Sequence, residues 1–265
     1  MNIRDENVLR ELNLYPLWVR KGGAAQTDQT PVEVSTPIEA QSFAEGVPES
    51  RLGGGEADTR QSMMGIAQPV LSKVEGLNPS YSSSLDWPEL KQQVKGCNAC
   101  KLRAGCTQTV FGVGDENADW LFVGEGPGAD EDERGEPFVG QAGKLLDNML
   151  AAIKLKRGNN VYIANVVKCR PPENRAPDAE EVATCLPYLK QQVALLKPKL
   201  IVALGKTAAT ALLGKDAPLG SMRGTVHDYN GTPLIVTYHP AYLLRSPAEK
   251  AKAWQDLCFA VSQFG

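Results

Sequence analysis

Four short apolar runs most constrain how this 265-residue chain can fold. They are residues 120–123, 161–164, 200–204 and 234–237. Runs this short and this apolar are typical of strands buried on both faces of a parallel sheet. Segments with helical spacing separate them, so strands and helices alternate along the chain. We therefore predict a three-layer α/β/α sandwich with a mostly parallel, four-stranded central sheet.

Capping and turn signals mark several boundaries of these elements. Asp178, followed by Glu181 three residues later, has the pattern of a capping box at a helix start. Ser246, with Pro next and Glu249 three residues on, predicts the same arrangement for the last helix. The Asn-Gly pair at 230–231 predicts a two-residue hairpin.

The amino-terminal third of the chain has a different composition from the rest. Residues 22–84 are rich in Gly, Ser, Thr, Gln, Pro and Glu, and we interpret them as a flexible linker. Residues 1–21 include a small amphipathic stretch that could dock on the core, bind a protein partner, or be disordered. We thus predict a disordered amino-terminal segment before a folded domain at residues 85–265.

Composition favours a cytoplasmic protein. No apolar run approaches the roughly 20 residues needed to span a bilayer. The first residues lack the apolar stretch of a secretory signal. The formal charge of −3 argues against a broad basic face that coats nucleic acid, but a short basic rim would suffice to dock on phosphates. We expect a monomer with no membrane association.

Three segments with chemical potential follow directly from predicted strands. They are Gly-Glu-Gly-Pro-Gly at 124–128, Asn165 and His239. The carboxyl ends of parallel strands meet at one edge of a sheet, where ligands bind, so we expect these segments to converge. An acidic run at 130–133 would repel a pyrophosphate. The glycine loop is therefore interpreted as a rigid turn beside an uncharged ligand, with a plain surface turn as the alternative.

Each candidate side chain also has an ordinary structural interpretation. Phe138 suits either the core or a platform for a planar ring. Asn165 offers an acceptor and donors either to a base edge or to nearby backbone. His239 is either a site residue or a histidine bonded to backbone. The Leu-Leu-Arg run at 243–245 supplies either core contacts or a wedge for a duplex with its Arg on phosphate.

Six cysteines in a cytoplasmic chain of this size favour ligands over disulfides. The spacing singles out Cys97, Cys100, Cys169 and Cys185. Thiolates bind zinc or iron–sulfur clusters, and spacing does not choose between them. The long gap after the first pair is unlike a zinc finger and fits a site that closes one side of a larger domain. Ordinary buried cysteines are the alternative for the downstream pair, and two cysteines have no assigned role.

Together these motifs resemble the family 4 uracil-DNA glycosylases, an iron–sulfur class of DNA-repair enzymes. The resemblance covers roughly residues 86–264 and rests on segments 124–132, 135–143, 165–172, 203–208 and 239–245. It implies a catalytic domain at 85–265 that removes uracil from single- and double-stranded DNA. The products would be free uracil and an abasic site.

The resemblance also implies roles for individual residues. Phe138 would stack on a flipped uracil, and Asn165 would bond its Watson–Crick edge and reject cytosine. Glu131 would crowd the C5 position and exclude thymine. His239 would face uracil O2. A structural 4Fe–4S cluster would lie on Cys97, Cys100, Cys169 and Cys185, and DNA contacts would come from Leu243, Leu244 and Arg245.

One departure concerns the attacking water. The resemblance places the backbone of Glu125 and Gly126 against the base, but a sister family carries a water-positioning acidic residue where Gly126 stands here. Leaving-group stabilisation alone, Asn165 or a backbone carbonyl remain as alternatives. Two other functions also stay open, a non-catalytic uracil-DNA or polymerase-associated binding module and a zinc α/β protein.

Overall fold

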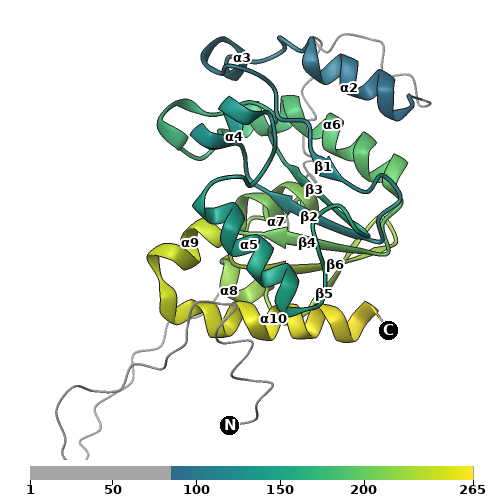
Figure 1. The fold of residues 1–265 in the computed structure, drawn as a ribbon, viewed down its shortest axis with the longest axis vertical. Coiled ribbons are helices and arrows are strands. Elements are labelled where there is room, and N and C mark those ends of the chain that lie inside the picture. Colours follow the sequence, from purple (N-terminus) through teal and green to yellow (C-terminus); the bar gives the residue numbers. More distant parts are fainter. Residues whose placement is uncertain (1–84, 265) are drawn as a thin grey trace, which may run out of the picture. The chain divides into compact units, whose positions relative to one another are not determined.

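The computed structural model describes residues 85–264. The predictions for residues 1–21 and 22–84 lie outside this range. A six-stranded sheet forms its centre, in the order β1-β3-β2-β4-β6-β5 (Figure 1). The strands are β1 (Val113–Gly114), β2 (Trp120–Gly124), β3 (Val161–Asn165), β4 (Leu200–Leu204), β5 (Val226–Tyr229) and β6 (Thr232–Thr237).

The four predicted strands are confirmed as the parallel centre of this sheet. Strands β3, β2, β4 and β6 run parallel, with Gly124 opposite Asn165 at one end of the register. The predicted strand number was wrong, because β1 and β5 add antiparallel edges. The β5–β6 hairpin turns through Asn230 and Gly231, both with positive φ, as the Asn-Gly signal predicted.

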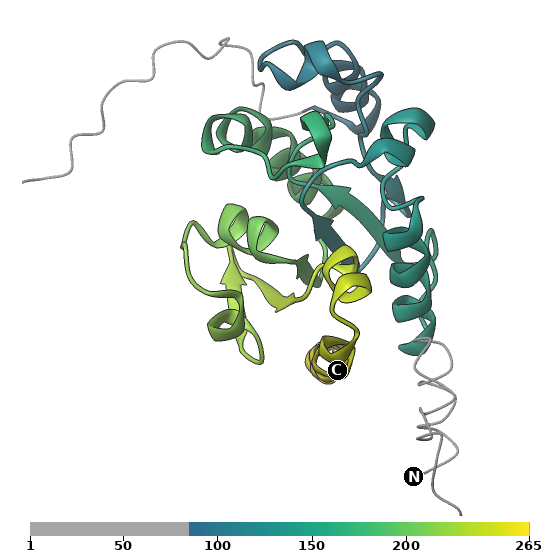
Figure 2. The same ribbon diagram turned by 90° about the vertical axis from the view of Figure 1, so that its left-hand side faces the viewer.

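Helices cover both faces of the sheet (Figures 1 and 2). One face packs on α5 (Gln141–Ala152), α9 (Pro240–Arg245) and α10 (Lys250–Phe264). The other packs on α6 (Ala179–Leu196), α7 (Lys206–Leu213) and α8 (Leu219–Met222). Alternate residues of each strand point to the two faces, so both helical layers bury apolar side chains against one sheet. The predicted three-layer α/β/α sandwich is confirmed.

Shorter elements complete the domain. They are α2 (Trp87–Lys95), α3 (Leu102–Gly105), α4 (Ala129–Arg134), the 3₁₀ turn η1 (Pro172–Asn174) and the 3₁₀ turn η2 (Pro247–Glu249). None of the helices formed by residues 85–264 combines the length and apolarity needed to cross a bilayer.

The two predicted capping boxes have different outcomes. At α6, Asp178 accepts from the Glu181 N–H and Glu181 accepts from the Asp178 N–H, both at 2.8 Å, so this box is confirmed. The box at Ser246 was wrong. Its side chain makes no capping bond, and η2 separates it from α10. Glu249 is instead bonded to Lys252.

Candidate functional site

A cavity of about 390 Å³ opens at the carboxyl ends of β2, β3 and β6. Segments separated by more than 100 residues in sequence meet there, as the strand-end argument predicted. Its wall includes Glu125, Gly126, Glu131, Phe138, Asn165, His239, Tyr242 and Arg245. A concave site at this edge of a parallel sheet is the usual place for a ligand in an α/β fold.

Phe138 is held over this cavity in a conformation that is rare for its residue type. Its φ is 55°, in the left-handed region. Two bonds from Arg157 fix the local backbone, to the Pro137 carbonyl at 2.8 Å and to the Phe138 carbonyl at 2.7 Å. Gly143 of α5 approaches the same carbonyl so closely that no side chain would fit there. Strain that is this firmly enforced is typical of functional sites.

The Phe138 ring and the Asn165 amide both pack directly over Gly124. A Cβ atom at Gly124 would lie 2.5 Å from Asn165 Oδ1 and 2.5 Å from Phe138 Cζ. The first glycine of the loop therefore creates the space that these two side chains share. The Phe138 ring also lies near the His239 ring, with centroids 5.4 Å apart at an interplanar angle of 30°.

Asn165 ends β3 and is 2% exposed. Its Oδ1 atom is buried and has no hydrogen-bond partner within the described part of the chain. A buried amide of this kind costs free energy unless a partner is supplied, and the cavity beside it is where that partner would bind.

His239 follows β6 and caps the N-terminus of α9. Its Nδ1 accepts from the Ala241 N–H at 3.1 Å, so a neutral ring carries its proton on Nε2. Burial, and then the positive charge of Arg245, lower the pKa of His239 to about 4, while Glu131 acts in the opposite direction. The ring is thus neutral at pH 7 and can donate one hydrogen bond from Nε2.

Two glutamates border the cavity, and both are held in place. The Glu131 carboxylate accepts from the N–H groups of Gly128 at 3.0 Å, Val139 at 2.9 Å and Gly140 at 3.0 Å. It thereby ties the glycine loop to the Phe138 segment. The Thr207 hydroxyl donates to the Glu125 carboxylate.

Gly126 brings backbone, and no side chain, to the cavity wall. A Cβ there would meet a Val167 methyl at 2.7 Å, so the loop lies tight against the segment that follows β3. The Val167 N–H also donates to the Glu125 carbonyl at 3.1 Å. The acidic residue of the sister family has no counterpart at this position.

The three residues predicted to contact DNA do not share one environment. Leu243 is 1% exposed and packs in the core with α5 and α10, so its predicted DNA contact was wrong and its core interpretation is correct. Leu244 is 43% exposed and Tyr242 38% exposed. Arg245 borders the cavity. The exposed side chains of α9 therefore lie beside the pocket.

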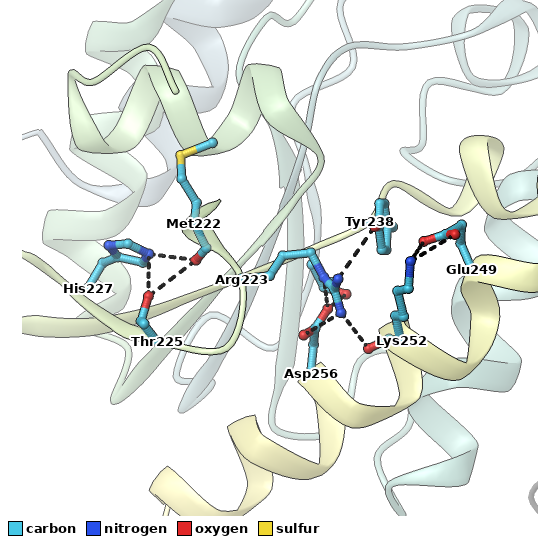
Figure 3. Close-up of polar contacts among 9 residues, drawn as sticks. Met222, Arg223, Thr225, His227, Tyr238, Glu249, Lys252 and Asp256 are labelled. Carbon is cyan, nitrogen blue, oxygen red and sulfur yellow. Dashed lines mark hydrogen bonds and ion pairs between the residues drawn. The ribbon is translucent and has the colours of Figure 1, made fainter. Parts of the chain in front are cut away.

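The second histidine belongs to a different part of the domain. His227 lies on the edge strand β5, and its Nε2 is 2.7 Å from the Met222 carbonyl and 3.2 Å from the Thr225 hydroxyl (Figure 3). Because a carbonyl only accepts, Nε2 of His227 carries a proton and donates it to the Met222 carbonyl. The ring therefore has a local structural partner.

A separate small cavity lies between α2, α3, β3 and α6. Its wall includes Cys97, Cys100, Cys169 and Cys185. No three Cys, His, Asp or Glu side chains within residues 85–264 are grouped to hold a single metal ion. Burial raises the pKa of Cys185 to about 11 and also raises the pKa of Cys169. A metal or cluster would therefore have to displace protons from these thiols.

Sequence reasoning missed three residues that organise these sites. Arg157 fixes the Phe138 backbone, Lys168 lies buried between the two cavities, and Cys106 is a free thiol that contributes, after burial, to the raised pKa of Cys169. Lys168 had a detectable signal, because a lysine beside a buried strand and a candidate ligand is unusual. The sequence around Arg157 carries no comparable signal.

Comparison with known proteins gives concordant results. The family model described as "Uracil DNA glycosylase superfamily" matches residues 111–258. A type-4 uracil-DNA glycosylase of Pyrobaculum aerophilum is 45% identical over 65% of this chain and 92% of its own length. Those of Thermotoga maritima and Archaeoglobus fulgidus are each 44% identical over 62% of this chain and 85% of their own. With matches of this extent and at these motifs, the chain belongs to the uracil DNA glycosylase superfamily and, within it, to the type-4 family.

Proposed function

We propose that this chain is a DNA-repair enzyme that hydrolyses the N-glycosidic bond of uracil in single- and double-stranded DNA. Free uracil and an abasic site are the products. The observation that carries the proposal is the meeting of the Asn165 amide, the Phe138 ring and the His239 ring at one cavity of about 390 Å³. A stacking face, an amide edge and a ring N–H donor around one concave site suit a planar base that has been flipped out of a duplex.

Base recognition would use Phe138 and Asn165. Uracil stacked on Phe138 presents N3–H and O4 on its Watson–Crick edge, and a carboxamide offers an acceptor and a donor to match them. Cytosine has a lone pair at N3 and an amino group at C4, so both contacts would be mismatched. The unpartnered Oδ1 of Asn165 supports this assignment, because leaving such a group unpaired costs about 1–3 kcal/mol.

Glu131 would limit the size of the accepted base. Its carboxylate borders the cavity and is fixed by three backbone N–H groups. Moving it aside would leave buried donors without their acceptor, so a base with an added C5 methyl would meet a wall that does not yield. We infer that this rigidity contributes to the rejection of thymine.

His239 would stabilise the departing base. Breaking the glycosidic bond places negative charge on uracil, and a donor fixed at O2 stabilises that charge in a water-poor site. A neutral imidazole with its proton on Nε2 can do this without having to lose a proton first. The bond from the Ala241 N–H to Nδ1 supports the role, since it fixes both the tautomer and the ring orientation.

The attacking water has no dedicated acidic residue at Gly126. We infer that leaving-group stabilisation supplies most of the rate enhancement. Backbone carbonyls of the loop, or the Glu125 carboxylate at the cavity wall, would orient the water. The Thr207 hydroxyl bonded to Glu125 limits the positions that this carboxylate can adopt.

Contacts with DNA would come from the exposed side of α9. Leu244 can fill the space left by the flipped nucleotide, and Arg245 can bind a flanking phosphate. The exposed Tyr242 at the cavity rim adds a flat apolar surface to the same region. Leu243 is excluded from this role by its burial.

We further propose a structural 4Fe–4S cluster held by Cys97, Cys100, Cys169 and Cys185. All four thiols border one small cavity, which supports a common ligand. When bound, the cluster would supply a covalent cross-link between the α2–α3 segment, the end of β3 and α6. These are the elements next to Asn165, so the cross-link would hold the base-reading strand end in place.

The decisive experiment measures uracil release from a defined oligonucleotide, with iron and zinc analysis of the same sample. Wild-type protein should release uracil from single strands and from duplexes with a G·U pair, and it should be brown with broad visible absorbance. Asn165→Asp should lose uracil activity by at least tenfold and gain activity on cytosine. A colourless zinc protein would contradict the cluster. Uracil-DNA binding without release would favour the non-catalytic binding module.

A further inference from the structure

Lys168 is a fully buried lysine that lies between the two cavities. Its side chain is among the largest in the domain with almost no solvent exposure, and the residue is 1% exposed. Its ammonium group donates to the Asn165 carbonyl at 2.8 Å and to the Gln192 Oε1 at 2.6 Å. Its own backbone N–H donates to the Cys185 Sγ at 3.2 Å. One residue thus contacts both the base-reading asparagine and a candidate cluster ligand.

The ammonium group has no carboxylate partner. No Asp or Glu within residues 85–264 forms an ion pair with Lys168. Both acceptors of its hydrogen bonds, the Asn165 carbonyl and the Gln192 side-chain oxygen, are neutral amide oxygens. A buried charge without a counter-charge is costly, and buried lysines are normally paired. Cys185 is the residue whose charge acts on the Lys168 ammonium group, and its thiol would be a thiolate in a metal-bound centre.

The contact with Asn165 replaces a missing sheet bond. Strand β3 ends at Asn165, and the next two N–H groups, of Val166 and Val167, still donate to the Gly124 and Glu125 carbonyls. The Asn165 carbonyl is bonded to the lysine ammonium instead of to a strand neighbour. The position of the Asn165 backbone therefore depends on the position of the Lys168 ammonium group.

Gln192 anchors the other side of this arrangement. It is fully buried on α6, accepts from Lys168, and donates to the Phe111 carbonyl at 2.9 Å. The ammonium group is consequently held from α6, the helix that also carries Cys185 about two turns before Gln192. Movement of α6 relative to β3 would be transmitted to Asn165 through this lysine.

We propose that Lys168 is a positioning residue, which acts as the internal counter-ion of the thiolate centre and fixes the Asn165 strand end through its carbonyl. This inference rests on the proposed function. It adds that the iron–sulfur centre and the base pocket are coupled through one buried cation. Lys168 does not touch the base, so its loss should lower kcat and leave the KM for DNA nearly unchanged.

The test compares three variants of the iron-containing protein. Lys168→Met keeps the length and removes the charge, Lys168→Arg keeps the charge and changes its geometry, and Lys190→Met removes an exposed lysine from α6, the helix that carries Cys185 and Gln192. Uracil excision kinetics and the midpoint potential of the cluster are measured for each. Loss of an outer-shell partner of a metal centre typically costs about 10–100-fold in activity or metal affinity.

We expect Lys168→Met to lower kcat about 10–100-fold and to shift the midpoint potential to more negative values, since a nearby positive charge favours the reduced cluster. Lys168→Arg should keep the wild-type potential and still lose kcat, because a longer planar group cannot occupy the same place. Lys190→Met should match the wild type in both measurements. If Lys168→Met does not fold, Lys168→Arg still decides, since wild-type kcat in that variant would overturn the proposal.

The two proposals fail in distinguishable ways. A wild-type protein that contains no iron, or that releases no uracil, defeats the proposed function. A wild-type protein with both properties, together with a Lys168→Met variant that matches Lys190→Met in kcat and potential, overturns the Lys168 proposal alone. In Lys168→Met, which removes the charge, a loss of kcat without any change of potential would show a packing role and would also overturn the counter-ion role.

Discussion

Two polar regions lie at the end of β6, and they treat their hydrogen-bonding groups in opposite ways. In the first, the Asp256 carboxylate on α10 accepts from the Thr237 hydroxyl at 2.7 Å and from Arg223 at 2.7 and 3.0 Å. Arg223 also donates to the Lys252 carbonyl and lies 4.4 Å from the centre of the Tyr238 ring (Figure 3). The charged groups here are mutually satisfied.

The second region is the proposed base pocket, which begins two residues further along the chain, at His239. There the Asn165 Oδ1 has no partner in the described residues, and Phe138 has a left-handed backbone. The comparison shows a division of labour at one strand end. Satisfied groups around Thr237 stabilise the fold, while strained or unpaired groups around His239 are kept available for a ligand.

The largest effect should come from the histidine of the pocket. His239→Ala removes a donor to the leaving group and should lower kcat by about 10²–10³-fold. His227→Ala is the matched control, because this other histidine bonds only local groups of the β5 edge. It should leave uracil release per folded molecule within about twofold of the wild type, because this half-buried ring lies outside the pocket. Equal losses of uracil release in the two variants would refute a specific role of the pocket histidine, His239.

The next effect should be on stability and should come from the satisfied network. Asp256→Ala leaves the Arg223 guanidinium, 12% exposed, without its carboxylate, and should reduce the free energy of unfolding by about 3 kcal/mol. Urea unfolding measures this. Glu116→Ala, which breaks the exposed Lys91 pair, is the control and should cost less than about 1 kcal/mol. A large loss of kcat per folded Asp256→Ala molecule would show that the network is part of the catalytic site.

The sequence was sufficient to predict that Asn165 and His239 meet at one edge of the sheet. Asn165 and His239 follow apolar runs directly, and in a parallel sheet such positions meet at one edge. The edge strands escaped prediction because β1 has only two residues, too few to show alternation. The hairpin signal at 230–231 did indicate that a strand, β5, precedes β6, so the sequence itself implied at least five strands.

The residues that hold the site in place could not be predicted in the same way. Arg157 is 19 residues from Phe138, and its bonds depend on how α5 packs. The burial of Leu243 and exposure of Leu244 could not be separated either, because α9 spans only six residues and gives too short a record of helical periodicity. Tertiary packing decides both points, and local pattern does not encode it.

The smallest expected effect is a dependence of stability on acidic pH that arises from the lowered pKa of His239. The pKa of His239 is lowered to about 4, so between about pH 4 and 6.5 the folded ring is neutral while an unfolded chain would be protonated. The unfolded state then binds more protons, and stability rises with pH across that window and is lost as pH falls. Above about pH 6.5 this residue contributes no slope.

The same neutral ring should make catalysis insensitive to pH near the usual histidine range. We expect kcat/KM for uracil release to change less than about threefold between pH 5.5 and 8, with the loss that arises from His239 appearing only toward pH 4. Steady-state kinetics, with an NMR titration of the ring assigned by comparison with His239→Gln, measures both quantities. A titration near pH 6.5 in the ring and in kcat/KM would mean that the pocket holds an imidazolium. A charged His239 ring, acted on by Arg245 and Glu131, would then be a paired group like those around Asp256, and the two regions would no longer differ in this respect.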